Sequence, residues 1–151
     1  MSNLTPVIKS IQDIMRQDCG VDGDAQRISQ LTWLLFLKVF DALEEELELT
    51  RDHYQSPIPE AMRWRNWAAD PEGMTGDALL DFVDNQLFAT LKSLSADPVR
   101  NPRGYVVRGV FEDAYNYMKS GHLLRQVVNK LGGIDFNRQA ERHQFNDLYE
   151  K

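Results

Sequence analysis

The segment from Ile28 to Leu49 constrains the fold of this chain more than any other stretch, because apolar residues cover most of its circumference. It reads ISQLTWLLFLKVFDALEEELEL. Two neighbouring stripes at helical spacing consist of Leu31, Leu35 and Val39 and of Trp33, Phe36, Phe40, Leu43 and Leu47. A helix with two such stripes is packed on most sides, which predicts a central helix at about residues 28–49. Lys38 and Asp41 interrupt the run of about 20 apolar residues that a membrane span needs.

A first helix precedes this segment and is marked at both ends. Thr5 can cap it and Pro6 suits its first turn, while Gly20 predicts its end in a left-handed conformation. The link from Gly20 to the central helix is short. We therefore expect the first helix and the central helix to pack antiparallel against each other.

Further helices are predicted after the central one. Thr75 can cap a long helix over 76–94 with a stripe of leucine and valine. Shorter helices are predicted at 107–119 and at 121–131, and a last one from Asn137. The apolar positions of these helices are Leu79, Leu80, Val83, Leu87 and Leu91, then Val107, Val110, Phe111, Ala114, Tyr115 and Met118, then Leu124, Val127, Val128 and Leu131, and finally Phe145, Leu148 and Tyr149. We predict an all-α fold, a compact bundle of five to seven helices around the helix at about 28–49.

Composition places the chain among ordinary globular proteins. Its 151 residues suffice for one domain with a real core, and its hydrophobic fraction of 42% is typical of soluble proteins. A single cysteine, Cys19, excludes an internal disulfide and favours a reducing compartment. Lys9 and Asp13 interrupt any early apolar run, so no signal peptide is indicated. A cytoplasmic location without a membrane is the natural expectation.

Charge is unevenly distributed along the chain. The net charge of −6 argues against a surface that binds nucleic acid everywhere. Residues 1–97 carry 8 basic and 17 acidic side chains, giving −9, whereas residues 98–151 carry 9 basic and 6 acidic side chains, giving +3. From Pro98 through Phe111 there is no acidic residue, while Arg100, Arg103 and Arg108 are basic. This stretch is the best candidate for a loop that contacts DNA phosphates; solvated arginines near the start of a helix are the alternative.

A second basic segment lies in the proline-rich region before residue 75. Arg63 and Arg65 alternate with Trp64, and Trp67 follows. Basic and aromatic residues interleaved in this way can bind single strands or flipped bases. The alternative is a loop anchored to the core by its tryptophans, with arginines that reach solvent or carboxylates.

No arrangement of residues in the sequence predicts catalysis, a metal site or a cofactor site. His53, His122 and His143 lack metal-ligand spacing. The acids around Asp18 lack the bidentate carboxylate of a calcium loop, because the twelfth position is Ser29. The glutamates that follow Leu43 are consecutive on a helix, so we expect a solvated helix end.

Four stretches together carry a resemblance to a known family. These are LTWLLFLKVFDALEEE in the central helix, the tryptophan loop IPEAMRWRNWA, the passage GVFEDAYNYMKSGHLLRQVVNKLGGIDF and the capped first helix. The chain resembles, over essentially all of its length, the N-terminal helical domain of the modification (M) subunit of type I restriction-modification systems.

The resemblance implies a role within a larger methyltransferase. In that family the M subunit is an adenine-N6 DNA methyltransferase that uses S-adenosylmethionine, and a methyltransferase domain follows the helical one. Two M subunits associate with a specificity subunit that reads the DNA, and an endonuclease-translocase subunit can join them. The helical domains are thought to help close the assembly around DNA.

The methyltransferase motifs themselves are absent from these 151 residues. Asn101-Pro102 is followed by Arg103, not by the proline and aromatic residue that hold an extruded adenine. We therefore expect residues 1–151 to be an N-terminal helical domain with no catalytic residue and no cofactor contact. The alternative is a free-standing helical interaction module without a DNA role.

Overall fold

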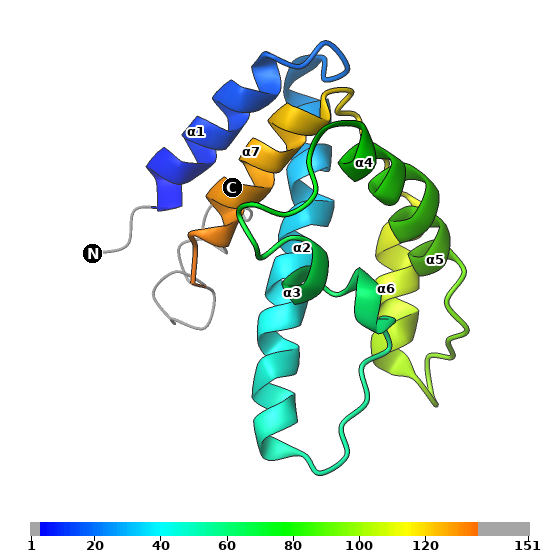
Figure 1. Ribbon diagram of the computed structural model, residues 1–151. Helices are drawn as coiled ribbons and strands as arrows, with labels where there is room; N and C mark the ends of the chain where they lie inside the picture. The colour runs from blue at the N-terminus through cyan, green and yellow to red at the C-terminus, as the bar shows by residue number, and fades with distance from the viewer. Residues whose placement is uncertain (1–3, 136–151) are drawn as a thin grey trace.

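Every regular element in the described part of the chain is helical. A computed structural model describes residues 4–135 (Figure 1). Its elements are α1 (Leu4–Arg16), α2 (Gly23–Thr50), η1 (Glu60–Met62), α3 (Trp64–Trp67), α4 (Gly76–Asp81), η2 (Phe82–Leu87), α5 (Phe88–Lys92), α6 (Pro102–Glu112) and α7 (Gly121–Gly132). Counting the unbroken run α4–η2–α5 once, and leaving out the three-residue 3-10 turn η1, gives six helices within residues 4–135. The predicted all-α bundle of five to seven helices is confirmed, while the helix predicted from Asn137, with Phe145, Leu148 and Tyr149, lies outside the described residues.

The longest helix, α2, forms the axis of the molecule as predicted. Figure 1 shows it running from top to bottom, with α1 and α7 on one side and α4 to α6 on the other. Helix α7 packs against α1, α2 and α4, and its four apolar residues, Leu124, Val127, Val128 and Leu131, are fully buried. None of the described helices is long and apolar enough to cross a membrane.

An aromatic cluster joins α2 to the second half of the bundle. The ring of Trp33 meets that of Phe88 at 4.8 Å and that of Phe111 at 6.3 Å, both edge to face. Phe88 and Phe111 lie 5.1 Å apart, with their planes at 90°. Such edge-to-face geometry adds stability beyond burial of apolar area. The cluster therefore fixes α2, α5 and α6 against one another.

The stripe of α2 that contains Ile28 and Phe36 lies at the edge of the core. Trp33, Leu35 and Phe40 are buried, but Phe36 is only partly buried. Ile28, two turns before it on the same face, is 49% exposed. Phe36 is mostly buried, as its apolar stripe indicates, but it lies at the edge of the core, where its ring is 6.3 Å from that of Phe111 in α6.

The first helix ends earlier than predicted and packs elsewhere. α1 stops at Arg16, and Gly20 does not have a positive φ. Gly20 is required for another reason: a Cβ there would lie 2.1 Å from the carbonyl oxygen of Tyr117. Thr5 lies inside the first turn of the helix instead of capping it. The helix that α1 packs against is α7 (Figure 1), so the antiparallel pairing expected between α1 and α2 is wrong.

The buried carboxylate of Asp18 joins the first loop to the segment before α7. It accepts hydrogen bonds from the backbone N–H of Gly20 (2.8 Å), Lys119 (2.9 Å) and Ser120 (2.9 Å). Asp18 is 3% exposed, and bonds between a charged group and buried amides are stronger than those between neutral groups. The carboxylate thus acts as a structural cross-link between these two segments.

The helix predicted over 76–94 contains a π-helical segment in its middle. Leu79, Val83, Leu87 and Leu91 are all fully buried, as predicted. In a regular α-helix each step of four residues turns about 40° past a full circle, so these four would drift around the helix. The π-helical hydrogen bonds of η2 add a residue to the turn and keep the four side chains on one face.

Helix α6 begins five residues before its predicted start at 107. The side chain of Asn101 accepts a hydrogen bond from the N–H of Gly104, and Pro102 occupies the first turn. The helix then ends at Glu112, so the predicted continuation to 119 is wrong. Tyr115, expected to face inward, is 53% exposed.

Truncation of Phe111 and of Phe36 should destabilise the domain to different extents. We expect Phe111→Ala to lower the free energy of unfolding by about 3–5 kcal/mol, as for other large aromatic residues in cores. Phe36→Ala should lower it by only about 1.5–3 kcal/mol, the free energy of burying the side chain alone. No closed cavity adds to this loss, because water can reach the space that the ring leaves. Urea unfolding followed by circular dichroism measures both. Equal losses would place Phe36 in the core.

Candidate functional site

The tryptophans between the two candidate arginines are part of the core. Trp64 and Trp67 are 3% and 4% exposed, and their rings meet edge to face at 5.5 Å. The indole N–H of Trp67 donates to the carbonyl of Met62, and its ring lies 5.6 Å from that of Phe82. Base stacking needs an open aromatic face. This segment therefore has the geometry of the packed loop, the alternative drawn from the sequence.

Arg65 is held by two carboxylates of α2. Its guanidinium lies 2.9 Å from Asp41 and 2.6 Å from Glu48. Desolvation by itself lowers the pKa of Arg65, but the hydrogen bonds and negative charges of Glu48 and Asp41 outweigh it and raise the pKa. Arg63 donates its Nε–H to the carbonyl of Ile58. Arg65 thus has its charge compensated within the domain, and Arg63 is tied to its own loop.

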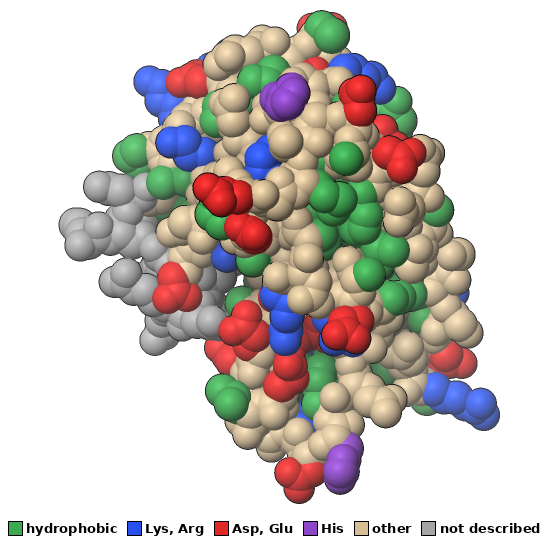
Figure 2. Space-filling model, viewed as in Figure 1, with side chains coloured by type: hydrophobic (Ala, Val, Ile, Leu, Met, Phe, Trp, Pro, Cys, Tyr) green, Lys and Arg blue, Asp and Glu red, His purple; other side chains and the backbone are tan. Residues whose placement is uncertain are grey.

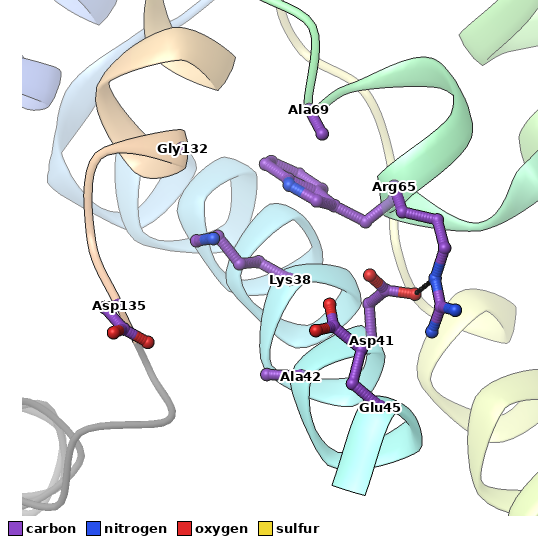
Figure 3. Close-up of a pocket in the computed structure, with 9 residues that line it drawn as sticks. Lys38, Asp41, Ala42, Glu45, Arg65, Ala69, Gly132 and Asp135 are labelled. Atoms are coloured by element: carbon purple, nitrogen blue, oxygen red, sulfur yellow. Dashed lines mark hydrogen bonds and ion pairs between the residues drawn. The ribbon is translucent and has the colours of Figure 1, made fainter. Parts of the chain in front are cut away.

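A small pocket opens beside the Arg65–Asp41 pair (Figure 3). It holds about 140 Å³. Its lining comes from α2, the α3 region and the end of α7, namely Lys38, Asp41, Ala42, Glu45, Trp64, Arg65, Ala69, Gly132 and Asp135. Sites for drug-sized ligands usually hold roughly 300–1,000 Å³. The pocket therefore has room for a few waters or one side chain.

Arg103 is also engaged inside the fold. Its Nε–H donates to the hydroxyl of Tyr54 at 3.0 Å, and its guanidinium lies 4.4 Å above the ring of Phe40. The same hydroxyl donates to Glu44 at 2.9 Å. Burial chiefly raises the pKa of Tyr54, with Glu44 adding to the rise and Arg103 opposing it.

The glutamate run at the end of α2 is only partly solvated. Glu44 is 1% exposed and accepts the bond from Tyr54, while Glu48 pairs with Arg65. Glu45 and Glu46 are exposed. The prediction of a solvated helix end is therefore wrong for Glu44, because the loop after α2 folds back over that side chain.

The two remaining candidates differ in how free they are. Arg108 is partly buried; it donates to the carbonyl of Leu94 at 3.1 Å and lies 3.8 Å from Glu112. Arg100 is exposed, and its described bond comes from its backbone N–H to Asp97. Backbone N–H groups of Val99 and Arg100 hold the pKa of Asp97 below its usual value. Of the five candidate arginines, Arg100 alone has a guanidinium that no described residue bonds.

Residues 4–131 match the family model described as the HsdM N-terminal domain. This chain belongs to that family. The resemblance to the N-terminal helical domain of type I modification subunits is thus confirmed.

Individual relatives agree with the family match. The chain is 64% identical over 149 residues to the methylase subunit of the type I restriction enzyme EcoEI from Escherichia coli, covering 99% of this chain and 30% of that protein. A solved modification subunit ascribed to a type I restriction enzyme of Vibrio vulnificus YJ016 superposes with a TM-score of 0.85 at 40% identity, over 96% of this chain and 33% of that one. The chain spans about a third of the length of such relatives.

A second solved relative comes from work on assembly. It is described as showing complex assembly and conformational transition of the type I restriction-modification system. It superposes with a TM-score of 0.82 at 32% identity, over 97% of this chain and 29% of that one. The HsdM fold of the described residues is therefore shared with subunits of type I systems.

Sequence reasoning missed the most heavily bonded side chain of this HsdM domain. Arg125 is 5% exposed and donates to the backbone carbonyls of residues before α4. Its acceptors are Trp67 (3.0 Å), Ala68 (3.1 Å), Asp70 (3.0 Å) and Met74 (2.7 Å). Desolvation lowers the pKa of Arg125, and the charge of Asp70 partly offsets it. The sequence signal for its burial was its place directly after Leu124, a residue of the apolar stripe of α7.

A double-mutant cycle should show that Arg65 is structural. We expect Arg65→Ala and Asp41→Ala to be coupled by about 1–2 kcal/mol in the free energy of unfolding, because Asp41 is only 7% exposed. The exposed pair Arg16–Asp13, with side chains 51% and 55% accessible, is the control and should show coupling below about 0.5 kcal/mol. Similar coupling for the two pairs would contradict this role for Arg65.

Proposed function

We propose that this chain serves as the N-terminal helical domain of an adenine-N6 DNA methyltransferase subunit of a type I restriction-modification system. There it helps clamp DNA and contacts partner subunits, and it performs no catalysis itself. The match to the HsdM N-terminal domain over residues 4–131, with 64% identity to the EcoEI methylase subunit, is the observation that carries the proposal. S-adenosylmethionine would bind in the methyltransferase domain of the parent subunit.

Local structure supports the separation of this domain from the chemistry. An adenine methyltransferase needs an aromatic residue to stack on the extruded base, next to asparagine and proline backbone groups that orient it. Here Asn101 caps α6 and Pro102 fills its first turn. These residues therefore start a helix and do not form a base pocket.

Assembly with other subunits is the second part of the proposal. The partners would be a specificity subunit, a second modification subunit and an endonuclease-translocase subunit, together with DNA in the complete complex. The relative described in terms of complex assembly and conformational transition supports this. The cytoplasm, where the cell's own DNA is methylated, is the proposed location.

Contact with DNA should be weak and should involve phosphates. The net charge of −6 opposes strong binding by the domain alone. Arg63, Arg65, Arg103 and Arg108 bond to groups within the domain, which leaves Arg100 as the leading phosphate contact. A free-standing helical interaction module without a DNA role is the alternative function.

The DNA role predicts a small, salt-dependent effect of Arg100. In the complete complex, Arg100→Ala should weaken DNA binding and lower the slope of log K against log salt by roughly one, because one phosphate contact is lost. The exposed Arg16, which pairs with Asp13 at the end of α1, provides the control variant Arg16→Ala. If both variants bind DNA like the wild type across the salt series, the clamping role is lost.

The assignment of chemistry to the rest of the subunit is testable by calorimetry. Titration of S-adenosylmethionine into residues 1–151 should give no binding, while the full-length methylase subunit should bind it. Reading the gene beyond Lys151 should reveal a glycine-rich cofactor motif and an Asn-Pro-Pro-aromatic motif. Micromolar binding to residues 1–151, or an open reading frame without these motifs, would contradict the proposal.

A further inference from the structure

Most of the exposed large apolar side chains in the described structure lie on α2, on α6 or on the segments beside α6. Six large apolar residues are exposed between residues 4 and 135. Five of them lie on α6, on the segments flanking it, or on α2: Val99, Tyr105, Val106, Tyr115 and Ile28. The sixth, Leu49, is at the other end of α2, next to Glu45, Glu46 and Glu48. Two of these residues, Ile28 on α2 and Val106 on α6, belong to the helices that border a groove.

The surface between α2 and α6 is hollowed at this place. A groove of about 190 Å³ runs between the two helices. It is lined by Ser29, Thr32, Trp33, Val110, Asp113 and Ala114. Ile28 lies one turn before Thr32 and Val106 one turn before Val110, so both extend the apolar lining beyond the groove. Helix α6 packs its other side on α5.

The backbone of α6 is open to close approach along the same face. A Cβ built at Gly109 would meet no atom within 4 Å. Gly109 lies one turn before Asp113 and three residues after Val106, so it shares their side of the helix. Small residues let a second helix approach closely, since no side chain separates the two backbones.

The groove also carries an uncompensated negative charge. Asp113 is exposed, and no described residue bonds its carboxylate. The nearest basic residues in the sequence are engaged elsewhere: Arg108 with Leu94 and Glu112, and Lys119 with Tyr115. A partner for this groove should therefore supply a positive charge near Asp113.

We infer that the α2–α6 groove is a docking site for an apolar helix of a different partner subunit, with a lysine or arginine of that helix placed opposite Asp113. A ridge of aliphatic side chains on one helix fits a groove between two others. The inference rests on the proposed role in subunit assembly and names the surface that serves it. DNA does not suit this face, because an acidic, apolar lining repels phosphate.

A second copy of this domain fits the groove less well. Apart from residues on α6, beside α6 or at the start of α2, the described residues include one exposed large apolar side chain, Leu49. The neighbours of Leu49 in the sequence include glutamates. The exposed Glu45, one turn before Leu49, carries the same charge as Asp113, and the two carboxylates would repel each other. Val99 and Arg100 belong to a turn before α6 and not to a helix, so they do not offer a helical ridge.

Replacement of apolar residues beside the groove by glutamate tests the inference in the reconstituted complete complex. Ile28→Glu and Val106→Glu should each weaken association of the full-length methylase subunit with its partner subunits by about tenfold or more. Both side chains are about half exposed, so thermal unfolding should be unchanged. Leu49→Glu, at an apolar side chain outside the groove, is the matched control and should associate like the wild type. Normal association of both groove variants would overturn the inference.

Two further variants identify the occupant. Asp113→Lys should weaken association, and exchange of a basic residue for glutamate on the partner helix should restore it. A photo-crosslinking residue at Gly109 should attach to an apolar helix of a different subunit. Attachment to DNA or to a second methylase subunit would overturn the assigned occupant.

Deletion of residues 1–135 separates the groove inference from the proposed assembly role. If the deletion leaves assembly unchanged, the assembly role fails. If the deletion abolishes assembly but the groove variants do not affect it, only the groove inference fails.

Discussion

The enclosure of Trp33 by Phe88 and Phe111 is the contact on which the described fold depends. The three rings come from segments more than 20 residues apart along the chain, and their edge-to-face packing sets the relative positions of α2, α5 and α6. The groove lies between two of these helices, α2 and α6, and Trp33 itself is part of its lining. The position of Arg100, just before α6, follows from the same packing.

Charged residues in this domain largely hold loops in place. Asp18 binds the backbone N–H groups of the segment before α7, and Arg125 binds the carbonyls of the segment before α4. Each of these side chains forms hydrogen bonds with several backbone groups. A buried backbone group without a partner would destabilise the fold by about 1–3 kcal/mol. Arginines that look like nucleic-acid contacts in the sequence can thus be structural. An acid-free stretch in the sequence is not the same as an acid-free surface, and on the face drawn in Figure 2 acidic side chains lie beside several basic ones.

The sequence predicted the elements with strong periodicity and missed contacts between distant residues. The stripes of α2, α7 and the run α4–η2–α5 gave their helices correctly, because burial of an apolar face dominates helix formation in proteins. The engagement of Arg103 could not be predicted, since Tyr54 is 49 residues away and Phe40 still further. The start of α6 is marked in the sequence by Asn101-Pro102, a cap and first-turn pair, whereas the buried apolar pattern begins only at Val107. Periodicity shows which face of a helix is apolar, not how completely a neighbour covers it, so the sequence did not show that Phe36 is less buried than Trp33.

The π-helical segment Phe82–Leu87 has a consequence for how sequences of this family should be aligned. A π-helical turn holds one residue more than an α-helical turn. A relative with one residue fewer in this segment could keep the same helix, with the same buried face before and after it, by forming a regular α-helix there. A single-residue gap within 82–87 should thus be read as a change in helix type and not as a misalignment. It would leave Leu79 and Leu91 matched with their counterparts on either side.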